Sequence, residues 1–379
     1  MQRWVQQRSI SAQNDGVVQK IADTGTTTIS TIPVLNNGAL NIQTGILNIT
    51  GSFSSGPVSS VAVVLGGTTA GTQYSQLSLA PTPTLAGDLF VTLNAFAPAS
   101  GDTFRLVNIP TGAHVGDFNS PRGYPPPSPG TVWVDAYDAN GLLLTAQAVT
   151  TSAVVTNLND SGPGSLRQAL TDAAGGFCNP CTITFNIPVP GPIPVLSPLP
   201  VPGTAVTIDA TTQPGYAGTP IVGVDGALCS GCDGLSLQGS SAIRGLAVYN
   251  FATGGAVWLE GTGSNTLTDS WIGINLSGAA AMNLAGAVID SASSNVISNN
   301  VISGNDFGVL VFGASPSTNN QITNNFIGTG PGGAGAIGNI VGVYLDVNAS
   351  QNIVLSNTIA NNSATGVVVK DPSSTGNGI

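Results

Sequence analysis

The sequence predicts an all-β protein whose C-terminal half is a parallel β-helix, preceded by a second β-solenoid or β-rich domain. Three observations support this class. The 379 residues include 50 Gly and 25 Pro but a single Glu, so long helices lack the residues that favour them. Short apolar runs alternate with polar residues along the first half of the chain. In the second half, a strand motif recurs with a nearly regular period.

The charge balance restricts the classes of partner. Eight Lys and Arg against 18 Asp and Glu give a net charge of −10, and no basic cluster occurs, so binding to nucleic acid is disfavoured. No apolar run is long enough to span a membrane, and no apolar segment follows the first basic residues as a signal peptide requires. We therefore expect no nucleic-acid partner, no membrane-spanning segment in this chain, and a sequence that is a piece of a longer protein.

Residues 1–35 are predicted to be a lead-in, and residues 36–150 a β domain of short strands and tight turns. Polar residues alternate there with Leu40 and Ile42, and Gly or Asn pairs mark the turns. The same pattern returns in several brief runs, each introduced by Gly or a polar turn. This alternation predicts strands with one buried face.

Four motifs of this domain carry a resemblance to a known group. They are YSQLSL at 74–79, APASGDTF at 97–104, GDF at 116–118 and YDANGLLL at 137–144. These motifs are similar to the strand repeats of bacterial autotransporter and filamentous-haemagglutinin passengers. The resemblance implies a β-solenoid on an exported surface protein, and it implies no catalytic residue.

Residues 151–203 are predicted to cap the β-helix, with one α-helix at 165–174. Ser165 and Gln168 have the spacing of a capping box. Apolar residues follow at helical spacing, at Leu166, Ala169, Leu170 and Ala173. A lone amphipathic helix ahead of a stack of strands can cover the open end of that stack.

Residues 204–379 contain the repeat Asn-x-Ile/Leu-x-x-Asn/Ser-x-Ile. Its copies begin at Asn265, Asn295, Asn320, Asn352 and Asn377, at offsets of 30, 25, 32 and 25 positions. One copy per turn places equivalent residues about 4.8 Å apart. Two inward columns are predicted, one of Leu267, Ile297, Ile322 and Val354, the other of Ile272, Ile302, Ile327 and Ile359. A third column, Asn300, Asn325 and Asn357, is predicted to adopt left-handed corners and to hydrogen-bond from turn to turn.

The C-terminal half also carries motifs of a known group. They are VTNLNDSGPGSLRQA at 155–169, VTIDATTQPGY at 206–216 and the Asn-x-Ile turns. Residues 155–379 look like the large bacterial right-handed parallel β-helix repeat proteins with a pectate-lyase-like architecture. The resemblance implies a right-handed parallel β-helix and a secreted or cell-surface location. The repeats of that family normally continue to a C-terminal cap, so we expect that this β-helix is truncated at its C-terminal end.

Catalysis has little support in the sequence. The one histidine, His114, lies in the first domain with no acidic constellation beside it. The candidate catalytic residues of the β-helix are Asp209, Asp225 and Asp233, but each precedes Gly or Ala in a turn context where Asp is common. We favour a protein without catalysis. The alternative is a polysaccharide lyase or glycoside hydrolase that acts through these Asp residues.

The four cysteines form two C-x-x-C pairs. These are Cys178 with Cys181, and Cys229 with Cys232. In an exported protein we expect disulfides, although the sequence leaves the connectivity open. A zinc site and free thiols remain the alternatives.

Acidic and aromatic residues mark a candidate binding face. Glu260 and Asp290 end strands on successive turns. Two carboxylates with nearby turn carbonyls supply oxygens that suit Ca²⁺, which is the only cofactor that the sequence suggests. Trp271, Phe326 and Tyr344 are the candidate glycan-binding aromatics. The simpler interpretation is that the acids mark strand ends and that loops cover the aromatics. We predict a secreted or cell-surface, autotransporter-like solenoid of adhesin type that binds glycans or surface proteins.

Overall fold

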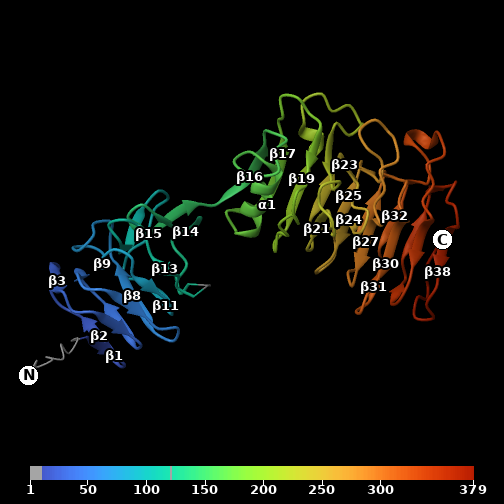
Figure 1. The fold of residues 1–379 in the computed structure, drawn as a ribbon. Helices are drawn as coiled ribbons and strands as arrows, with labels where there is room; N and C mark the ends of the chain where they lie inside the picture. Colours follow the sequence, from blue (N-terminus) through green and yellow to red (C-terminus); the bar gives the residue numbers. More distant parts are fainter. Residues whose placement is uncertain (1–10, 120–121) are drawn as a thin grey trace, which may run out of the picture. The chain divides into compact units, whose positions relative to one another are not determined.

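The computed structural model describes residues 11–119 and 122–379, and the chain divides into two compact units (Figure 1). The units are Met1–Val149 and Thr150–Ile379. Short strands, mostly paired in parallel, build both units, and the described residues contain one α-helix. The predicted all-β class with a single helix is therefore confirmed.

The N-terminal unit is a three-sheet solenoid. The chain visits the three sheets in turn, so that β2 pairs in parallel with β5, and β5 with β8. One sheet contains β1 (Ala12–Asn14), β4 (Val34–Asn36), β7 (Phe53–Ser55), β10 (Thr84–Leu85) and β13 (Val115–Gly116). The second contains β2 (Val17–Lys20), β5 (Ala39–Ile42), β8 (Ser60–Leu65) and β11 (Asp88–Leu93). The third contains β3 (Thr26–Ile29), β6 (Ile46–Ile49), β9 (Gln76–Leu79), β12 (Thr103–Asn108), β14 (Thr131–Asp138) and β15 (Gly141–Ala148).

The solenoid starts earlier than residue 36. Strands β1 to β3 lie within the segment predicted as a lead-in, and each pairs with a strand of the next turn. Most of their side chains are exposed, so the apolar alternation that marks the later turns is weak there. The unit ends in a different way, because β15 pairs antiparallel with both β12 and β14.

A charged network ties the segment after β13 to the hairpin strand β14. Arg122 donates two hydrogen bonds to Asp117, at 2.7 and 2.8 Å, and also pairs with Asp135. Tyr137 donates to Asp117 at 2.8 Å, and the ring of His114 stacks on Tyr137 with 3.9 Å between centroids. Burial alone raises the pKa of Asp117, but the hydrogen bonds from Tyr137 and Arg122 outweigh it and hold that pKa below its ordinary value.

The C-terminal unit is a parallel β-helix of three main sheets, named here sheets I, II and III. Sheet I contains β16 (Thr150–Val155), β17 (Cys178–Phe185), β19 (Val206–Asp209), β22 (Ala242–Arg244), β25 (Thr266–Thr268), β28 (Val296–Ser298), β32 (Gln321–Thr323) and β36 (Ile353–Leu355). Sheet II contains β18 (Pro192–Pro194), β20 (Val222–Asp225), β23 (Leu246–Tyr249), β26 (Trp271–Ile272), β29 (Val301–Ile302), β33 (Phe326–Ile327) and β37 (Thr358–Ile359). Sheet III contains β21 (Leu235–Leu237), β24 (Gly255–Leu259), β27 (Ala285–Asp290), β30 (Phe307–Phe312), β34 (Val341–Leu345) and β38 (Thr365–Val369). Outside these sheets lie the short pair β31 (Ser317–Thr318) and β35 (Ala349–Ser350) and the 3-10 helices η1 (Ala210–Thr212) and η2 (Pro331–Gly333).

Strand register confirms both predicted inward columns. The pairing aligns Ile272, Ile302, Ile327 and Ile359 on sheet II, and Leu267, Ile297, Ile322 and Val354 on sheet I. Ile272, Ile302 and Ile327 are fully buried, whereas Ile359 is half-buried. The repeat period therefore predicts which residues form the core, because each turn lies directly on the turn before it.

The predicted asparagine column is a hydrogen-bonded ladder. Asn300 Nδ2 donates to Asn325 Oδ1 at 3.0 Å, and Asn325 Nδ2 donates to Asn357 Oδ1 at 3.0 Å. The left-handed corners, however, lie one position earlier, at Asn299 (φ 59°) and Asn324 (φ 58°). The prediction placed both roles on one residue, but the corner residue points outward and its neighbour points inward.

Two further ladders were not predicted from the sequence. One runs through Asn295, Asn320 and Asn352, and the other through Asn283, Asn305, Asn339 and Asn362. Their side-chain amides also bond backbone groups of adjacent turns. Each ladder thus satisfies buried backbone groups at a turn where strand pairing stops.

The predicted helix is α1 (Leu166–Ala174). Ser165 caps it, since its hydroxyl accepts from the backbone N–H of Gln168 at 3.1 Å. The side chain of Gln168 donates to Asp172 instead of returning to the cap, so only half of the capping box forms. The four predicted apolar residues are buried and join the core of the β-helix. Strands β16, β17 and β18 already belong to sheets I and II, so the β-helix begins within the predicted cap at 151–203.

Candidate binding face

An outward column on sheet II holds two of the three predicted glycan-binding aromatics. The register places Val301 between Trp271 and Phe326, so the two rings lie two strands apart, at about 10 Å. In each of these strands the following Ile points into the core. Both aromatic side chains are half-buried. The structure therefore brings Trp271 and Phe326 onto one face.

A groove of about 220 Å³ runs along this column. Trp271, Val301 and Phe326 line it from three neighbouring strands, Asp269 from the corner just ahead of β26, and Tyr216 from the segment between η1 and β20. Burial, and then the nearby carboxylate of Asp269, raise the pKa of Tyr216. We call this feature the sheet II groove. It combines aromatic surface with a phenol and a carboxylate, the mixture typical of a small-ligand site.

The Gly-rich loop after β26 packs against one of the aromatic rings of the groove, and the Gly-rich loop after β33 lines the groove. Leu276, in the first loop, packs with Trp271 in a small cluster beside the main core. Gly332, in the second loop, lines the groove itself, and a Cβ at the next residue, Gly333, would lie 3.2 Å from the ring of Phe326. The loops cover part of each aromatic ring and leave the rest facing the groove.

Tyr344 lies elsewhere. It belongs to β34 on sheet III, where Phe307 meets it edge to face at 5.4 Å between centroids. The ammonium of Lys370 lies 5.7 Å from the centre of the Tyr344 ring. Tyr344 is therefore not part of the face that carries Trp271 and Phe326.

The predicted Ca²⁺ ligands follow neighbouring strands of sheet III. Glu260 comes directly after β24, and Asp290 ends β27, which pairs with β24. Glu260 Oε2 accepts from Gln238 Nε2 at 2.6 Å and from Ser236 Oγ at 3.1 Å, and Asp290 accepts from Ser291 at 2.9 Å. In the described part of the chain, no group of three or more His, Cys, Asp or Glu could hold a metal ion. Ca²⁺ binding at this pair therefore stays a prediction.

The three candidate catalytic acids occupy three different sheets. Asp209 ends a strand of sheet I and lies 3.6 Å from Arg244. Asp225 ends a strand of sheet II and accepts from Asn250 at 2.8 Å. Asp233 precedes a strand of sheet III and accepts from the backbone N–H of Gly255 at 2.8 Å. Each carboxylate is used locally, and the structure does not gather the three into one site.

The described cysteines are paired locally. Disulfides join Cys178 to Cys181 and Cys229 to Cys232. The first lies in β17, and the second closes the loop that precedes β21.

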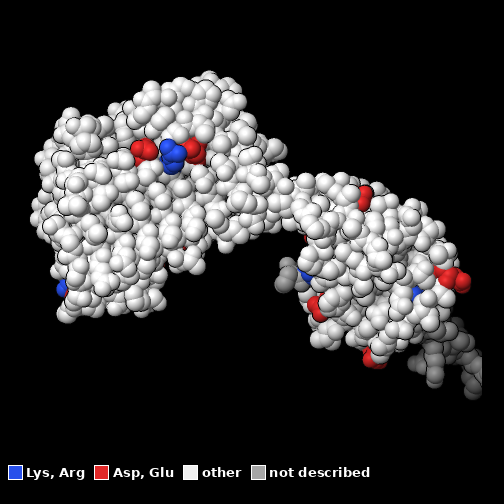
Figure 2. All heavy atoms as spheres, turned by 180° about the vertical axis from the view of Figure 1, so that it is seen from behind, with Lys and Arg blue, Asp and Glu red and all other residues white. Residues whose placement is uncertain are grey.

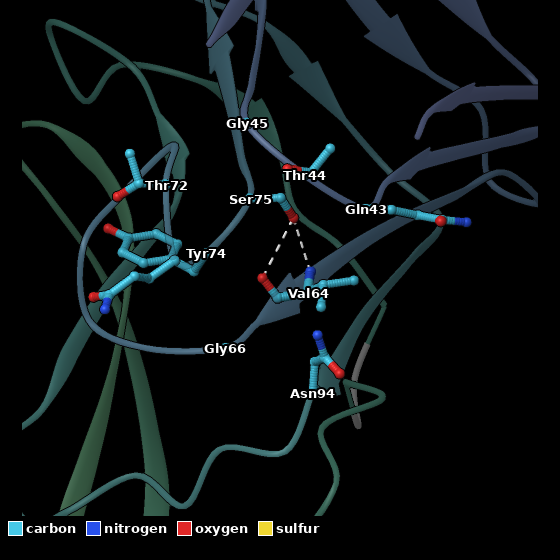
Figure 3. Close-up of a pocket in the computed structure, with 10 residues that line it drawn as sticks. Gln43, Thr44, Gly45, Val64, Gly66, Thr72, Tyr74, Ser75 and Asn94 are labelled. Atoms are coloured by element: carbon cyan, nitrogen blue, oxygen red, sulfur yellow. Dashed lines mark hydrogen bonds between the residues drawn. The ribbon is translucent and has the colours of Figure 1, made fainter. Parts of the chain in front are cut away.

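A polar pocket in the N-terminal unit has no counterpart among the sequence predictions. It measures about 210 Å³ and is lined by uncharged residues that include Gln43, Thr44, Tyr74 and Asn94 (Figure 3). Ser75, at its wall, accepts from the backbone N–H of Val64 at 2.8 Å. Its lining comes from several turns, so no local motif in the sequence marks it.

Charged side chains are sparse on the face shown in Figure 2, where they form isolated spots on an uncharged surface. No extended basic patch appears on that face, in agreement with the low Lys and Arg content. Among the residues that the structure describes, no helix has the length and apolarity that crossing a bilayer requires.

Comparisons with known proteins agree with the fold. A family model described as a right handed beta helix region matches residues 231–378. The C-terminal unit is thus a right-handed parallel β-helix. No curated protein matches the chain.

Among solved structures, the chain is similar to the crystal structure of a TibC-catalyzed hyper-glycosylated TibA fragment. The TM-score is 0.26 and the identity 11%, over 97% of this chain and 99% of that one. A likeness at this level indicates no shared activity.

Proposed function

We propose that this chain is a secreted or cell-surface solenoid of adhesin type that binds glycans through the sheet II groove, without catalysis. The observation that carries the proposal is the joint placement of Trp271, Phe326, Tyr216 and Asp269 in one groove. Aromatic rings pack against the apolar face of a sugar, while the phenol and carboxylate hydrogen-bond to its hydroxyl groups.

The groove favours an uncharged glycan. Asp269 contributes a negative charge that repels uronates, and no Lys or Arg lines the groove. The rings of Trp271 and Phe326 lie two turns apart, so a chain of several sugars along the stack contacts both. Surface proteins remain the other class of partner for this face.

An exported location is part of the proposal. Two disulfides within C-x-x-C motifs suit an oxidising compartment, because reducing cytosol keeps such thiols free. Labelling of intact producing cells with an antibody raised against the chain checks this point. Signal only after the cells are lysed would contradict it.

The test of function is a glycan array followed by calorimetric titration of the best neutral oligosaccharide. We expect Trp271→Ala to weaken binding about tenfold, equivalent to about 1.4 kcal/mol, and Trp271→Phe to retain part of the affinity. Phe312→Ala is the matched control, because Phe312 is a half-buried outward aromatic on sheet III. Equal affinity of Trp271→Ala and wild type would remove the groove from the proposal.

The alternative function is a polysaccharide lyase or glycoside hydrolase. The same oligosaccharides, incubated with the chain and assayed for new reducing ends, test hydrolysis, and uronate oligosaccharides assayed for unsaturated products test lyase activity. Product formation that Asp209→Asn, Asp225→Asn or Asp233→Asn abolishes would replace the binding proposal with catalysis.

A further inference from the structure

A further pocket, of about 280 Å³, lies against sheet III. Trp258 of β24 and Ser236 of β21 form its floor, with Glu260 just beyond the end of β24. Leu199 and Val201 come from the loop ahead of β19, and Gly231 to Gly234 from the loop ahead of β21. We call this feature the sheet III pocket. It shares no lining residue with the sheet II groove.

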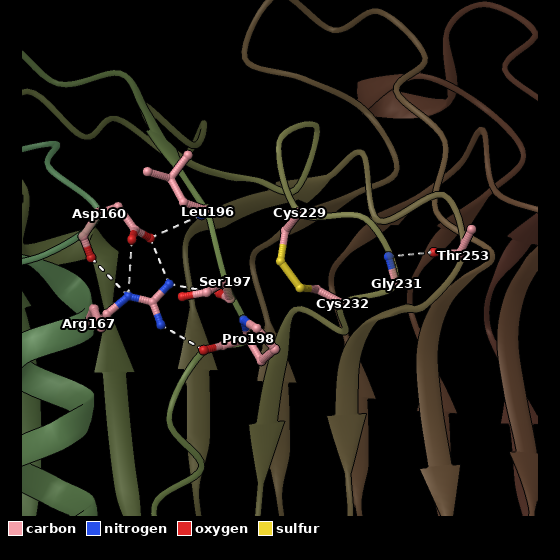
Figure 4. The surroundings of a disulfide bond; sticks show 9 residues. All are labelled: Asp160, Arg167, Leu196, Ser197, Pro198, Cys229, Gly231, Cys232 and Thr253. Carbon is pink, nitrogen blue, oxygen red and sulfur yellow. Dashed lines mark hydrogen bonds and ion pairs between the residues drawn. A yellow bond between two sulfur atoms is a disulfide. The ribbon is translucent and has the colours of Figure 1, made fainter.

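One wall of the sheet III pocket is fastened to the helix. Arg167 of α1 donates to the backbone carbonyls of Ser197, at 2.8 Å, and Pro198, at 2.6 Å (Figure 4). Asp160 orients this guanidinium, with 2.7 Å between Arg167 Nη2 and Asp160 Oδ1, and it also accepts from the backbone N–H of Leu196 at 3.2 Å. Arg167 therefore holds in place the loop that carries Leu199 and Val201.

The opposite wall is fastened as well. The Cys229–Cys232 disulfide closes the loop, and the backbone N–H of Gly231 donates to Thr253 Oγ1 at 3.2 Å (Figure 4). Cys232 and Gly231 both line the pocket. A pocket with two fixed walls loses little conformational freedom when it takes up a ligand.

The pocket carries two carboxylates that no cation balances. Asp233 and Glu260 take part in none of the ion pairs within residues 11–119 and 122–379. The hydrogen bonds that the described residues make to them use Asp233 Oδ1 and Glu260 Oε2. Asp233 Oδ2 and Glu260 Oε1 are left for a ligand. The half-buried Trp258 lies in the same pocket, and an aromatic ring attracts a cation in its own right.

We infer that the sheet III pocket binds an amino sugar in its protonated form. The ammonium group pairs with Glu260 and faces the ring of Trp258, while Leu199 and Val201 pack against the apolar face of the sugar. Asp233, beside the first residue of β24 and so at the other end of that strand, accepts from a hydroxyl group of the same sugar. The volume of about 280 Å³ lies at the lower end of the range of small-molecule sites, about 300–1,000 Å³, and suits a single sugar unit. The negative charges of Asp233 and Glu260 repel uronates, and a neutral sugar has no positive group to pair with them. This inference does not depend on the sheet II groove.

The test is calorimetric titration of the full chain with a β-1,4-linked glucosamine tetramer and with its N-acetylated counterpart, which lacks the charge. We expect the amine form to bind at least tenfold more tightly and to weaken as salt rises. Glu260→Gln is expected to weaken it about fivefold or more, and Asp233→Asn by a smaller factor. Asp306→Asn, just ahead of β30 and outside the pocket, is the matched control and should leave binding unchanged.

Several outcomes would overturn the inference. One is equal affinity for the amine and its N-acetylated form, and another is unchanged binding by both carboxylate variants while circular dichroism shows that they are folded. Binding of a lysine peptide without binding of the glucosamine tetramer would assign the pocket to protein partners. Cleavage of the tetramer would make the pocket an active site instead of a binding site.

Discussion

The asparagine ladder at the corner between sheets I and II gives the sharpest stability prediction, through the substitution Asn325→Ala. Asn325 is 1% exposed. Its Oδ1 accepts from the backbone N–H of Asn300 at 2.9 Å and from Asn300 Nδ2 at 3.0 Å. Its Nδ2 donates to the carbonyl of Ile297 at 2.9 Å and to Asn357 Oδ1 at 3.0 Å. The substitution removes all four bonds.

The four losses are unequal. The backbone N–H of Asn300 has no other partner and becomes a buried, unsatisfied donor, which costs about 1–3 kcal/mol. Asn300 Nδ2 keeps its bond to the carbonyl of Leu267, so that loss is smaller. Asn357 Oδ1 still accepts from the backbone N–H of Asn325. We therefore expect Asn325→Ala to lower the free energy of unfolding by about 2–4 kcal/mol.

The assay combines urea unfolding of the full chain with amide hydrogen exchange. Gln321→Ala is the matched control, because Gln321 is exposed on the same turn and should change stability by no more than about 0.5 kcal/mol. Exchange at the Asn300 amide should accelerate in Asn325→Ala and not in Gln321→Ala. If the free energies of unfolding of the two variants differ by less than about 0.5 kcal/mol, and the dependence on urea concentration (the m value) is the same, the ladder does not stabilise the fold.

Four further predictions address the core, the helix, acid stability and Ca²⁺. Ile302→Ala should lower the free energy of unfolding by about 2–5 kcal/mol and Ile302→Val by about 1 kcal/mol, because Ile302 is fully buried; equal urea midpoints would contradict this. Ser165→Ala removes the helix cap and should cost about 1 kcal/mol by the same measurement, with Ser165→Asn as the variant that retains a cap. The lowered pKa of Asp117 means that its contribution to stability is present above a pH of about 4 and is lost as the pH falls below it; Asp117→Asn should flatten this acid dependence in near-UV circular dichroism. Ca²⁺ titration should give weak heat with wild type and none with the Glu260→Gln/Asp290→Asn double variant, and absence of heat with both would make the pair structural.

Repetition made the core predictable from the sequence. A period of one turn per copy fixes which residues lie above one another, so Ile272, Ile302 and Ile327 could be placed in a single column from spacing alone. The same logic placed Asn300 above Asn325. It failed by one position for the left-handed corners, because spacing does not distinguish an Asn that turns the chain from its inward neighbour.

The segment bounds inside each unit were harder to predict than the boundary between the units, which lies within one residue of the predicted one. Strands β1 to β3 are polar and mostly exposed, so their sequence carries little of the alternation that marks a half-buried strand. Strand β17 carries Asn179 and Pro180 between its two cysteines. An Asn-Pro pair is typical of a turn and not of a strand inside a sheet. In both places the segment is held in a strand by its pairing with the neighbouring turn, although its own sequence does not favour a strand.

The sheet III pocket could not be predicted, for a related reason. The sequence grouped Asp233 with two other acids as catalytic candidates and Glu260 with Asp290 as a Ca²⁺ pair, and Trp258 lies within an ordinary strand motif, so none of them indicated a shared site. They line one pocket because the loop carrying Leu199 and the loop closed by Cys232 are irregular insertions against a regular stack.

Periodicity specifies contacts between equivalent residues of adjacent turns, and such contacts build columns. A pocket needs the opposite, namely unlike residues brought together at one place. In this chain the unlike residues come from segments where the repeat is interrupted: the turn around Tyr216 and the loop at Gly332 for the sheet II groove, and the Arg167-anchored loop for the sheet III pocket. Binding specificity in this solenoid should therefore change through loop substitutions that leave the columns, and hence the stability of the stack, nearly untouched.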